Sequence, residues 1–245
     1  MEVHAHTHTA RKKWTHYFWE FLMLFLAVFC GFLAEYKLEH VIEHQRERKY
    51  VQSLIQDLKK DTANIQVYID LRKEKRVMMD SLVLLLNTGE HKQLGNETYF
   101  FARHVFFGQP FVSTDGTMQQ LKNAGNLRLI KNENIINNIL GYDASVKELR
   151  EWDESDTRIK TTFREIGGNV FDADKLYKVF SPDYQFVKPT TNPQLITDNP
   201  LMINNVAFQI QYLALGSLGN ALRGKALKTK AENLIELLKK EYQLQ

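Results

Sequence analysis

The stretch 17-YFWEFLMLFLAVFCGFLAEY-36 decides the fold of this chain. A helix of its 20 residues is about 30 Å long, which matches the hydrocarbon core of a bilayer. Phe21–Ala34 carries no charge, and eight of its fourteen residues are Phe or Leu. Aromatic residues flank this run in the manner of an interfacial belt: Trp14, Tyr17, Phe18, Trp19 and Tyr36. The stretch predicts a transmembrane anchor over residues 14–36, preceded by a disordered polar tail over residues 1–13.

Two other interpretations of this stretch fit less well. A buried helix of a soluble protein would keep a polar face, and residues 21–34 have none. A cleaved signal peptide would end in a small-residue cleavage site or a turn. Here Ala34-Glu35-Tyr36 leads directly into a helical pattern. We therefore expect an uncleaved, single-pass anchor.

A stripe of small residues and one carboxylate runs along the anchor. Residues 20, 24, 27, 31 and 34 share one helical face, with the three-and-four spacing of a packing seam. Ala27 and Gly31 form a small-xxx-small pair, which lets a second helix approach closely. Glu20 either reaches the headgroups or meets a donor on that helix, because a carboxylate is costly inside a bilayer. The candidate packing residues are Glu20, Ala27, Gly31 and Ala34, and they favour a homo-oligomer or a partner membrane protein.

Composition and charge exclude some classes of partner. The 32 basic and 29 acidic residues give a net charge of +3, a field too weak to indicate nucleic-acid binding. The single cysteine, Cys30, excludes an intramolecular disulfide and does not identify the compartment. The basic residues 11–13 directly before the anchor favour a cytoplasmic N-terminus. In a bacterium the chain would then lie in the inner membrane, with its large domain in the periplasm.

The rest of the chain, residues 37–245, is predicted to form a helical soluble domain. Apolar residues recur with a helical period from residue 51 onward, so a long membrane-proximal helix should reach about Leu86. Further helices are expected over residues 116–124, capped by Ser113–Asp115, and over 133–166, capped by Asn132. A last helix, or helix pair, is expected over 201–242, with Asn199 as its cap and Pro200 at the first position. Residues 169–199 contain three of the five prolines and are expected to be irregular. The predicted architecture is all-α, with strand content near zero.

Aromatic residues are dense in the segment after His91–Asn96, where a short helix closed by Gly108 and Pro110 is expected. They line either the core of a helical bundle or a ligand pocket, and the core is the commoner case: Tyr99, Phe100, Phe101, Phe106, Phe107 and Phe111. The charged stretch 148-ELREWDESDTR-158 is typical of a solvated helix face with Trp152 packed beneath it. We therefore expect Trp152 and the aromatic residues to be mostly buried.

Two stretches of the sequence are similar to a known family. They are 19-WEFLMLFLAVFCGFLAEYKLEH-40 with the following 45-QRERKYVQSLIQDLKKDTANI-65, and 117-TMQQLKNAGNLRLIKNENIINNILGYD-143. Together they resemble uncharacterised single-pass, mostly helical membrane proteins common in Bacteroidetes. In the second stretch Met118 stands where that family has an aromatic residue, and Asp143 where it has a second tyrosine. The resemblance implies an inner-membrane helical protein and no assigned activity.

The sequence favours an interaction protein over an enzyme. Asp and Glu are plentiful but never stand with His, Ser or Gly-rich elements in a catalytic pattern. His4, His6 and His8 lack supporting ligands, so we expect neither a metal nor a cofactor. The favoured function is a membrane-anchored scaffold or accessory subunit that acts through protein–protein contacts and is oligomeric. The alternative is a sensor-like bundle that binds a small molecule or a peptide between the aromatic cluster and the Pro-rich segment.

Overall fold

The computed structural model of this chain describes residues 14–244, so the tail 1–13 and its histidines lie outside the described residues. The chain divides into two units, one ending at Lys49 and the other beginning at Tyr50. Within the described residues the structure is helical and contains no strand, apart from an isolated bridge between Phe180 and Phe186. The all-α architecture predicted from the sequence is confirmed.

The first unit is built on the beginning of α1, a helix that covers Trp14–Thr88. From Trp14 to Tyr36 every side chain is exposed except that of Leu22, which is half-buried. Among the described helices, α1 is the one long and apolar enough to cross a membrane. So much exposed apolar surface is unfavourable in water.

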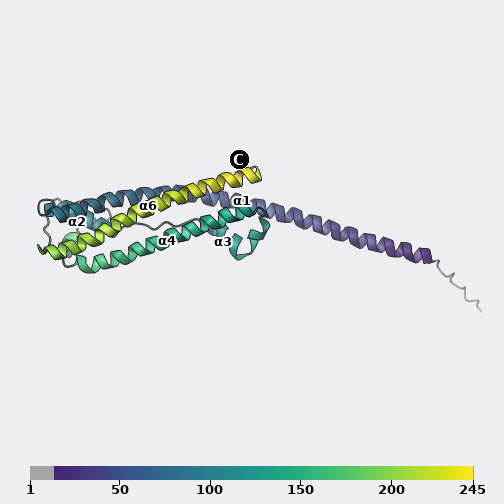
Figure 1. Cartoon of the computed structure of the whole chain (residues 1–245), viewed down its shortest axis with the longest axis horizontal. Helices are drawn as coiled ribbons and strands as arrows, with labels where there is room; N and C mark the ends of the chain where they lie inside the picture. Colours follow the sequence, from purple (N-terminus) through teal and green to yellow (C-terminus); the bar gives the residue numbers. More distant parts are fainter. Residues whose placement is uncertain (1–13, 245) are drawn as a thin grey trace, which may run out of the picture. The chain divides into compact units, whose positions relative to one another are not determined.

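The second unit is a bundle of long helices with short elements between them. Besides the later part of α1 it contains η1 (Glu90–Lys92), α2 (Gly95–Val105), α3 (Gly116–Asn123), η2 (Asn126–Leu129), α4 (Glu133–Gly167), α5 (Ala173–Tyr177) and α6 (Pro200–Tyr242). The later part of α1, α4 and α6 lie side by side along their length (Figure 1), because each contributes an apolar face to a shared core.

Two of the long helices begin at the capping residues that the sequence predicts. The side chain of Asn132 accepts hydrogen bonds from the first backbone N–H groups of α4, and Asn199 does the same for α6, with Pro200 at the first helical position. The helix predicted from residue 116 is present as α3 with Asp115 at its N-cap position, but the predicted cap was wrong, since Asp115 makes no capping bond. The carboxylate of Asp57 on α1 accepts the hydrogen bond from Thr117 N instead, at 3.2 Å.

Two hydrophobic clusters fill the interior of the bundle. One joins α1, α3, α4 and α6 at the end that contains Tyr50 and includes Val51, Leu58, Ile65, Leu121, Ile135, Ile139, Leu149, Leu227, Leu234 and Leu238. The other joins α1, α2, α4 and α6 at the opposite end and includes Met79, Leu82, Tyr99, Val105, Phe163, Val206, Ile210 and Leu213. Along each long helix, buried polar residues separate the two clusters: Arg72 and Lys75 on α1, Asp153 and Asp156 on α4, and Ser217 and Asn220 on α6. These six residues are called the polar layer below.

Candidate functional site

The polar layer is a closed network of charges and hydrogen bonds. The Arg72 guanidinium donates to Asp153 and, over 2.7 Å, to Oδ2 of Asp156. Asn220 Nδ2 lies 3.3 Å from a carboxylate oxygen of each aspartate. The hydroxyl of Tyr68 donates to Asp153 Oδ1 over 2.7 Å. One cation therefore bridges two buried carboxylates, and neutral donors from α1 and α6 occupy their remaining lone pairs.

Burial changes the acidity of these groups. Desolvation raises the pKa of Asp156, although the nearby Arg72 opposes that change. Desolvation also raises the pKa of the Tyr68 hydroxyl. Burial, together with the positive charges of Lys160 and Arg72, lowers the pKa of Lys75 to about 6. Lys75 is therefore largely neutral at pH 7 inside the bundle.

The polar layer and a second buried carboxylate hold the connection between α2 and α3 against the bundle. Lys75 Nζ donates to Phe107 O over 2.5 Å, and the backbone N–H of Phe111 donates to Asp153 Oδ2 over 3.2 Å. Asp61 accepts from Thr114 N and from the Tyr142 hydroxyl, each over 2.6 Å. Because this connection is irregular, its polar backbone groups need such partners. These side chains are engaged in fixing the fold.

The aromatic residues predicted from the sequence divide between the core and a pocket. Tyr99 and Phe111 are buried, and Phe100, Phe101 and Phe106 are half-buried. The prediction of burial was wrong for Phe107, which is 42% exposed. The Tyr99 hydroxyl donates to Gln194 O and accepts from Asp172 N, so it ties the Pro-rich segment to α2.

The prediction for the charged middle of α4 was also wrong. Asp153 and Asp156 are buried, whereas Trp152 is 44% exposed. The Arg223 guanidinium lies 3.8 Å from the Trp152 ring centre, which covers one face of the indole. The other charged residues of this stretch are exposed as predicted, so the error concerns only Trp152 and the two aspartates.

An arginine–aromatic pocket opens between α2, α4 and α5. It is a cavity of about 320 Å³ whose apolar wall includes Phe106, Phe107, Phe163, Phe171 and Leu176. Arg103 and Arg164 also line it. The phenylalanines at 106 and 107 were predicted from the sequence, but the two arginines were not, since they lie 61 positions apart in the sequence on different helices. No local pattern connects them, so only the fold brings them together.

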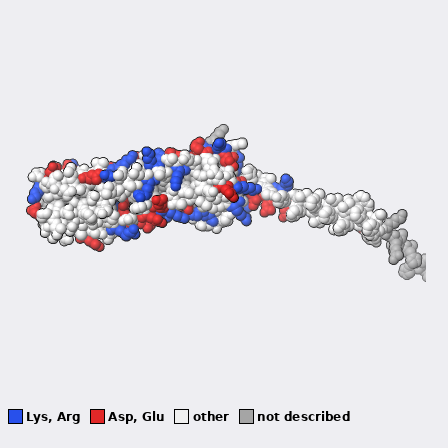
Figure 2. Space-filling view, in the orientation of Figure 1, with Lys and Arg blue, Asp and Glu red and all other residues white. Residues whose placement is uncertain are grey.

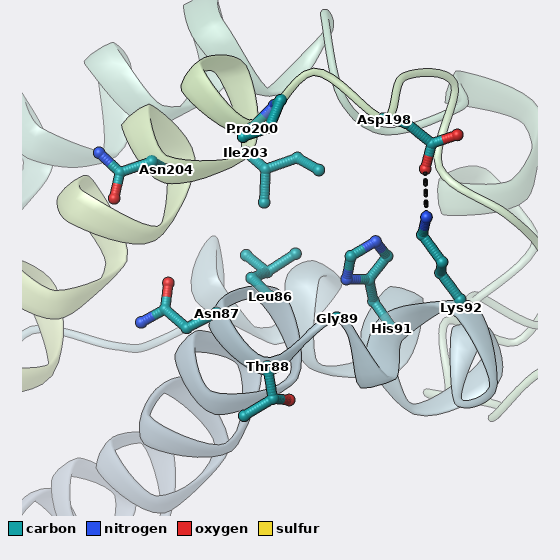
Figure 3. Close-up of a pocket in the computed structure, with 10 residues that line it drawn as sticks. All are labelled: Leu86, Asn87, Thr88, Gly89, His91, Lys92, Asp198, Pro200, Ile203 and Asn204. Carbon is teal, nitrogen blue, oxygen red and sulfur yellow. Dashed lines mark ion pairs between the residues drawn. The ribbon is translucent and has the colours of Figure 1, made fainter.

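A second cavity, of about 400 Å³, lies where α1 ends and α6 begins (Figure 3). Leu86 and Ile203 face one another across it, and an ion pair between Lys92 and Asp198, 3.1 Å long, lies at its edge. His91 is buried; its Nδ1 lies 3.2 Å from Leu85 O, and its Nε2 has no hydrogen-bond partner. This mixture of apolar, charged and amide groups favours no single class of ligand.

The first half of α6 has an exposed apolar face. No charged residue occurs between Pro200 and Leu222. One face of this half is buried in the core, and the other exposes Leu201, Met202, Phe208, Tyr212, Leu215, Leu218 and Leu222. In Figure 2 the end of the bundle where α6 begins shows few charged side chains on the visible surface. Asn204, Asn205 and Gln211 are exposed on this half as well, so its outer side is uncharged and rich in apolar side chains.

The four candidate packing residues of the N-terminal segment are all exposed in the single chain. His16 Nε2 lies 4.0 Å from a carboxylate oxygen of Glu20, one turn away on an exposed face. A side chain added at Gly31 would meet no atom of this chain within 4 Å. The surface around Gly31 is therefore open to a neighbouring helix, and the predicted seam over Glu20, Ala27, Gly31 and Ala34 stays a prediction.

Comparison of this chain with protein families, with curated proteins and with solved structures finds no match.

Proposed function

We propose that this protein is a membrane-anchored, self-associating helical scaffold without catalytic activity of its own. The observation that carries the proposal is the first half of α6, which has no charged residue and exposes a set of large apolar side chains besides those buried in the core. Exposed apolar surface of this extent marks an interaction site in a soluble domain. The uncovered N-terminal segment of α1 supports an anchor in a bilayer.

The proposed occupant of the α6 face is a second copy of the same face. Leu201, Phe208, Leu215 and Leu222 are spaced seven residues apart, as in a helix–helix seam. Because the face carries no charge, two copies can meet without repulsion. A symmetric dimer needs only such a self-complementary surface.

The N-terminal segment favours the same assembly. Anchoring confines copies to a membrane plane, which raises their effective concentration. The open surface at Gly31 adds a second place where two chains can approach closely. The proposed location is a bacterial inner membrane with the large domain in the periplasm, supported by the basic residues 11–13.

The test is the mass of the full chain in mild detergent, measured by light scattering. The wild type should be a dimer or a larger oligomer. Leu215→Glu should shift the mass toward one chain, because it places a carboxylate in an apolar interface at a cost of several kcal/mol. The matched control is Leu140→Glu on α4: Leu140 is 40% exposed and Leu215 is 49% exposed, yet only Leu215 lies on the proposed face.

Two outcomes would reject the proposal for α6. One is a wild type that stays a single chain at every concentration, and the other is equal behaviour of Leu215→Glu and Leu140→Glu. The contribution of the anchor is measured separately with Gly31→Leu against Phe29→Leu. A bulky residue at 31 should weaken assembly, whereas replacement of Phe29, which lies off the seam, should not.

A further inference from the structure

The arginine–aromatic pocket has two cations whose charges are not balanced by carboxylates. Within residues 14–244, neither Arg103 nor Arg164 forms an ion pair or a side-chain hydrogen bond. Their charged groups instead contact aromatic rings. The Arg103 guanidinium lies 4.6 Å from the centre of the Phe180 ring and 5.6 Å from that of Phe107. The Arg164 guanidinium lies 5.8 Å from the centre of the Phe106 ring.

Contact with aromatic faces leaves the hydrogen-bond donors of both arginines available. An aromatic ring is at best a weak hydrogen-bond acceptor, so a guanidinium that lies over a ring keeps its N–H groups available for a stronger acceptor. Nε of Arg103 is buried and has no hydrogen-bond partner. Burial also lowers the pKa of this guanidinium. An unpartnered buried donor of this kind calls for a ligand, an ion or a water.

Of the acidic residues nearest in sequence to the pocket, Glu165 is exposed and does not line it, and Asp172 and Asp174 are engaged elsewhere. Asp172 accepts hydrogen bonds from the backbone N–H groups of Asp174 and Lys175 and so caps α5. Asp174 pairs with Lys178 over 2.7 Å. The pocket therefore keeps a positive charge inside a largely apolar wall.

We propose that the arginine–aromatic pocket binds a small organic carboxylate with an aromatic or aliphatic body. The carboxylate would accept hydrogen bonds from Arg103 and Arg164, the geometry for which a guanidinium is best suited. The apolar body would lie against Phe106, Phe163 and Phe171. A cavity of about 320 Å³ is at the small end of the usual range for ligand sites. This inference is independent of self-association through α6, because it concerns a different surface.

The test is calorimetric titration of the full chain in lipid nanodiscs, with empty nanodiscs as the blank. The probes are 3-phenylpropionate and octanoate, each compared with its neutral alcohol. Both acids contain the proposed carboxylate, and their relative affinities show whether the pocket prefers an aromatic or an aliphatic body. Each acid that binds should bind at least about 10-fold more tightly than its alcohol, since hydrogen bonds to charged groups are worth that much.

Variants then assign the binding to the two arginines. Arg103→Met and Arg164→Met should each weaken binding of the preferred acid by about 10- to 100-fold. Arg158→Met is the control, because Arg158 is an exposed arginine on the same helix as Arg164 and does not line the pocket. If Arg103→Met fails to fold, Arg164→Met still tests the inference. Arg164 is exposed, so its replacement should leave the fold intact.

Three results would overturn the inference. They are no binding of either acid to the wild type, equal binding of acid and alcohol, and equal affinities of Arg164→Met and Arg158→Met. The mass measurement that tests self-association would be unaffected by any of them.

Discussion

Replacing Arg72 by methionine removes the cation that bridges Asp153 and Asp156, and it should strongly destabilise the second unit. The Arg72 side chain is 6% exposed, and those of its two partners are similarly buried. Methionine fills much of the same volume but leaves the two buried carboxylates without the cation that pairs with both of them. Breaking a buried ion pair in this way costs about 3–5 kcal/mol. For a domain of this size the melting temperature should fall by about 6–20 °C.

The assay is thermal unfolding of the full chain in detergent at about pH 7, followed by far-ultraviolet circular dichroism. Arg76→Met is the matched control one turn further along α1, where Arg76 pairs with the exposed Asp80 over 2.8 Å. A surface pair contributes about 0–1 kcal/mol, so this control should melt within about 4 °C of the wild type.

A double variant checks the stated cause. Asp156→Asn in the Arg72→Met background removes one of the two uncompensated carboxylates. The double variant should therefore be more stable than the sum of the two single losses predicts, by about 0.5–3 kcal/mol. The reasoning would be refuted if Arg72→Met and Arg76→Met melted at the same temperature. It would also be refuted if the stability losses of Arg72→Met and Asp156→Asn simply added in the double variant.

Three further predictions concern other buried positions. Because Lys75 releases its proton near pH 6 in the folded chain but near 10.4 when unfolded, the unfolded state binds more protons between these values. The free energy of unfolding should rise by about 1.4 kcal/mol per pH unit from about pH 7 to 10. Lys75→Met should lose this slope. Parallel pH curves of the wild type and the variant would contradict the prediction. Gly216→Ala should destabilise by about 1–3 kcal/mol, because its Cβ would lie 2.7 Å from a buried carboxylate oxygen. Gly141→Ala, which meets no atom within 4 Å, should instead stabilise α4, and equal melting temperatures would count against the steric argument. Phe163→Ala should lower the free energy of unfolding by about 3–5 kcal/mol. Phe107→Ala should lower it clearly less, because Phe107 is exposed. A lower melting temperature for Phe107→Ala than for Phe163→Ala would show that the pocket wall is not core.

Much of the helical architecture follows from local patterns in the sequence. The apolar period identifies α1, α4 and α6. Asn132 and Asn199 give the exact first residues of α4 and α6, because a capping hydrogen bond joins residues that are close in sequence. The five-residue helix α5 was missed inside the segment predicted to be irregular. Asp172 was its signal, since an aspartate before a short polar run can cap a single helical turn.

The candidate sites were less predictable, because they depend on contacts between distant residues. In the sequence, Arg72 and Lys75 stand in a run dense with charge, which is typical of a solvated face. Asp153 and Asp156 stand in a similar run on α4. Each set would be costly to bury by itself, and only the pairing of one with the other makes burial acceptable. The charges on a single helix therefore do not reveal that either set is buried.

The same pairing explains how three long helices with similar apolar faces reach one alignment. Apolar side chains pack acceptably in several registers, since dispersion and burial are not directional. The hydrogen bonds and ion pairs of the polar layer, in contrast, depend on direction. Sliding α4 by one turn moves its residues about 5.4 Å along the bundle. That shift would break at least one of the two contacts between Arg72 and the aspartates, and it would place a charge against apolar side chains such as Leu149 or Met79 at either side of the layer. The cost of unpaired buried charge exceeds what any alternative apolar contact returns, so the polar layer selects the register that the two hydrophobic clusters alone leave open.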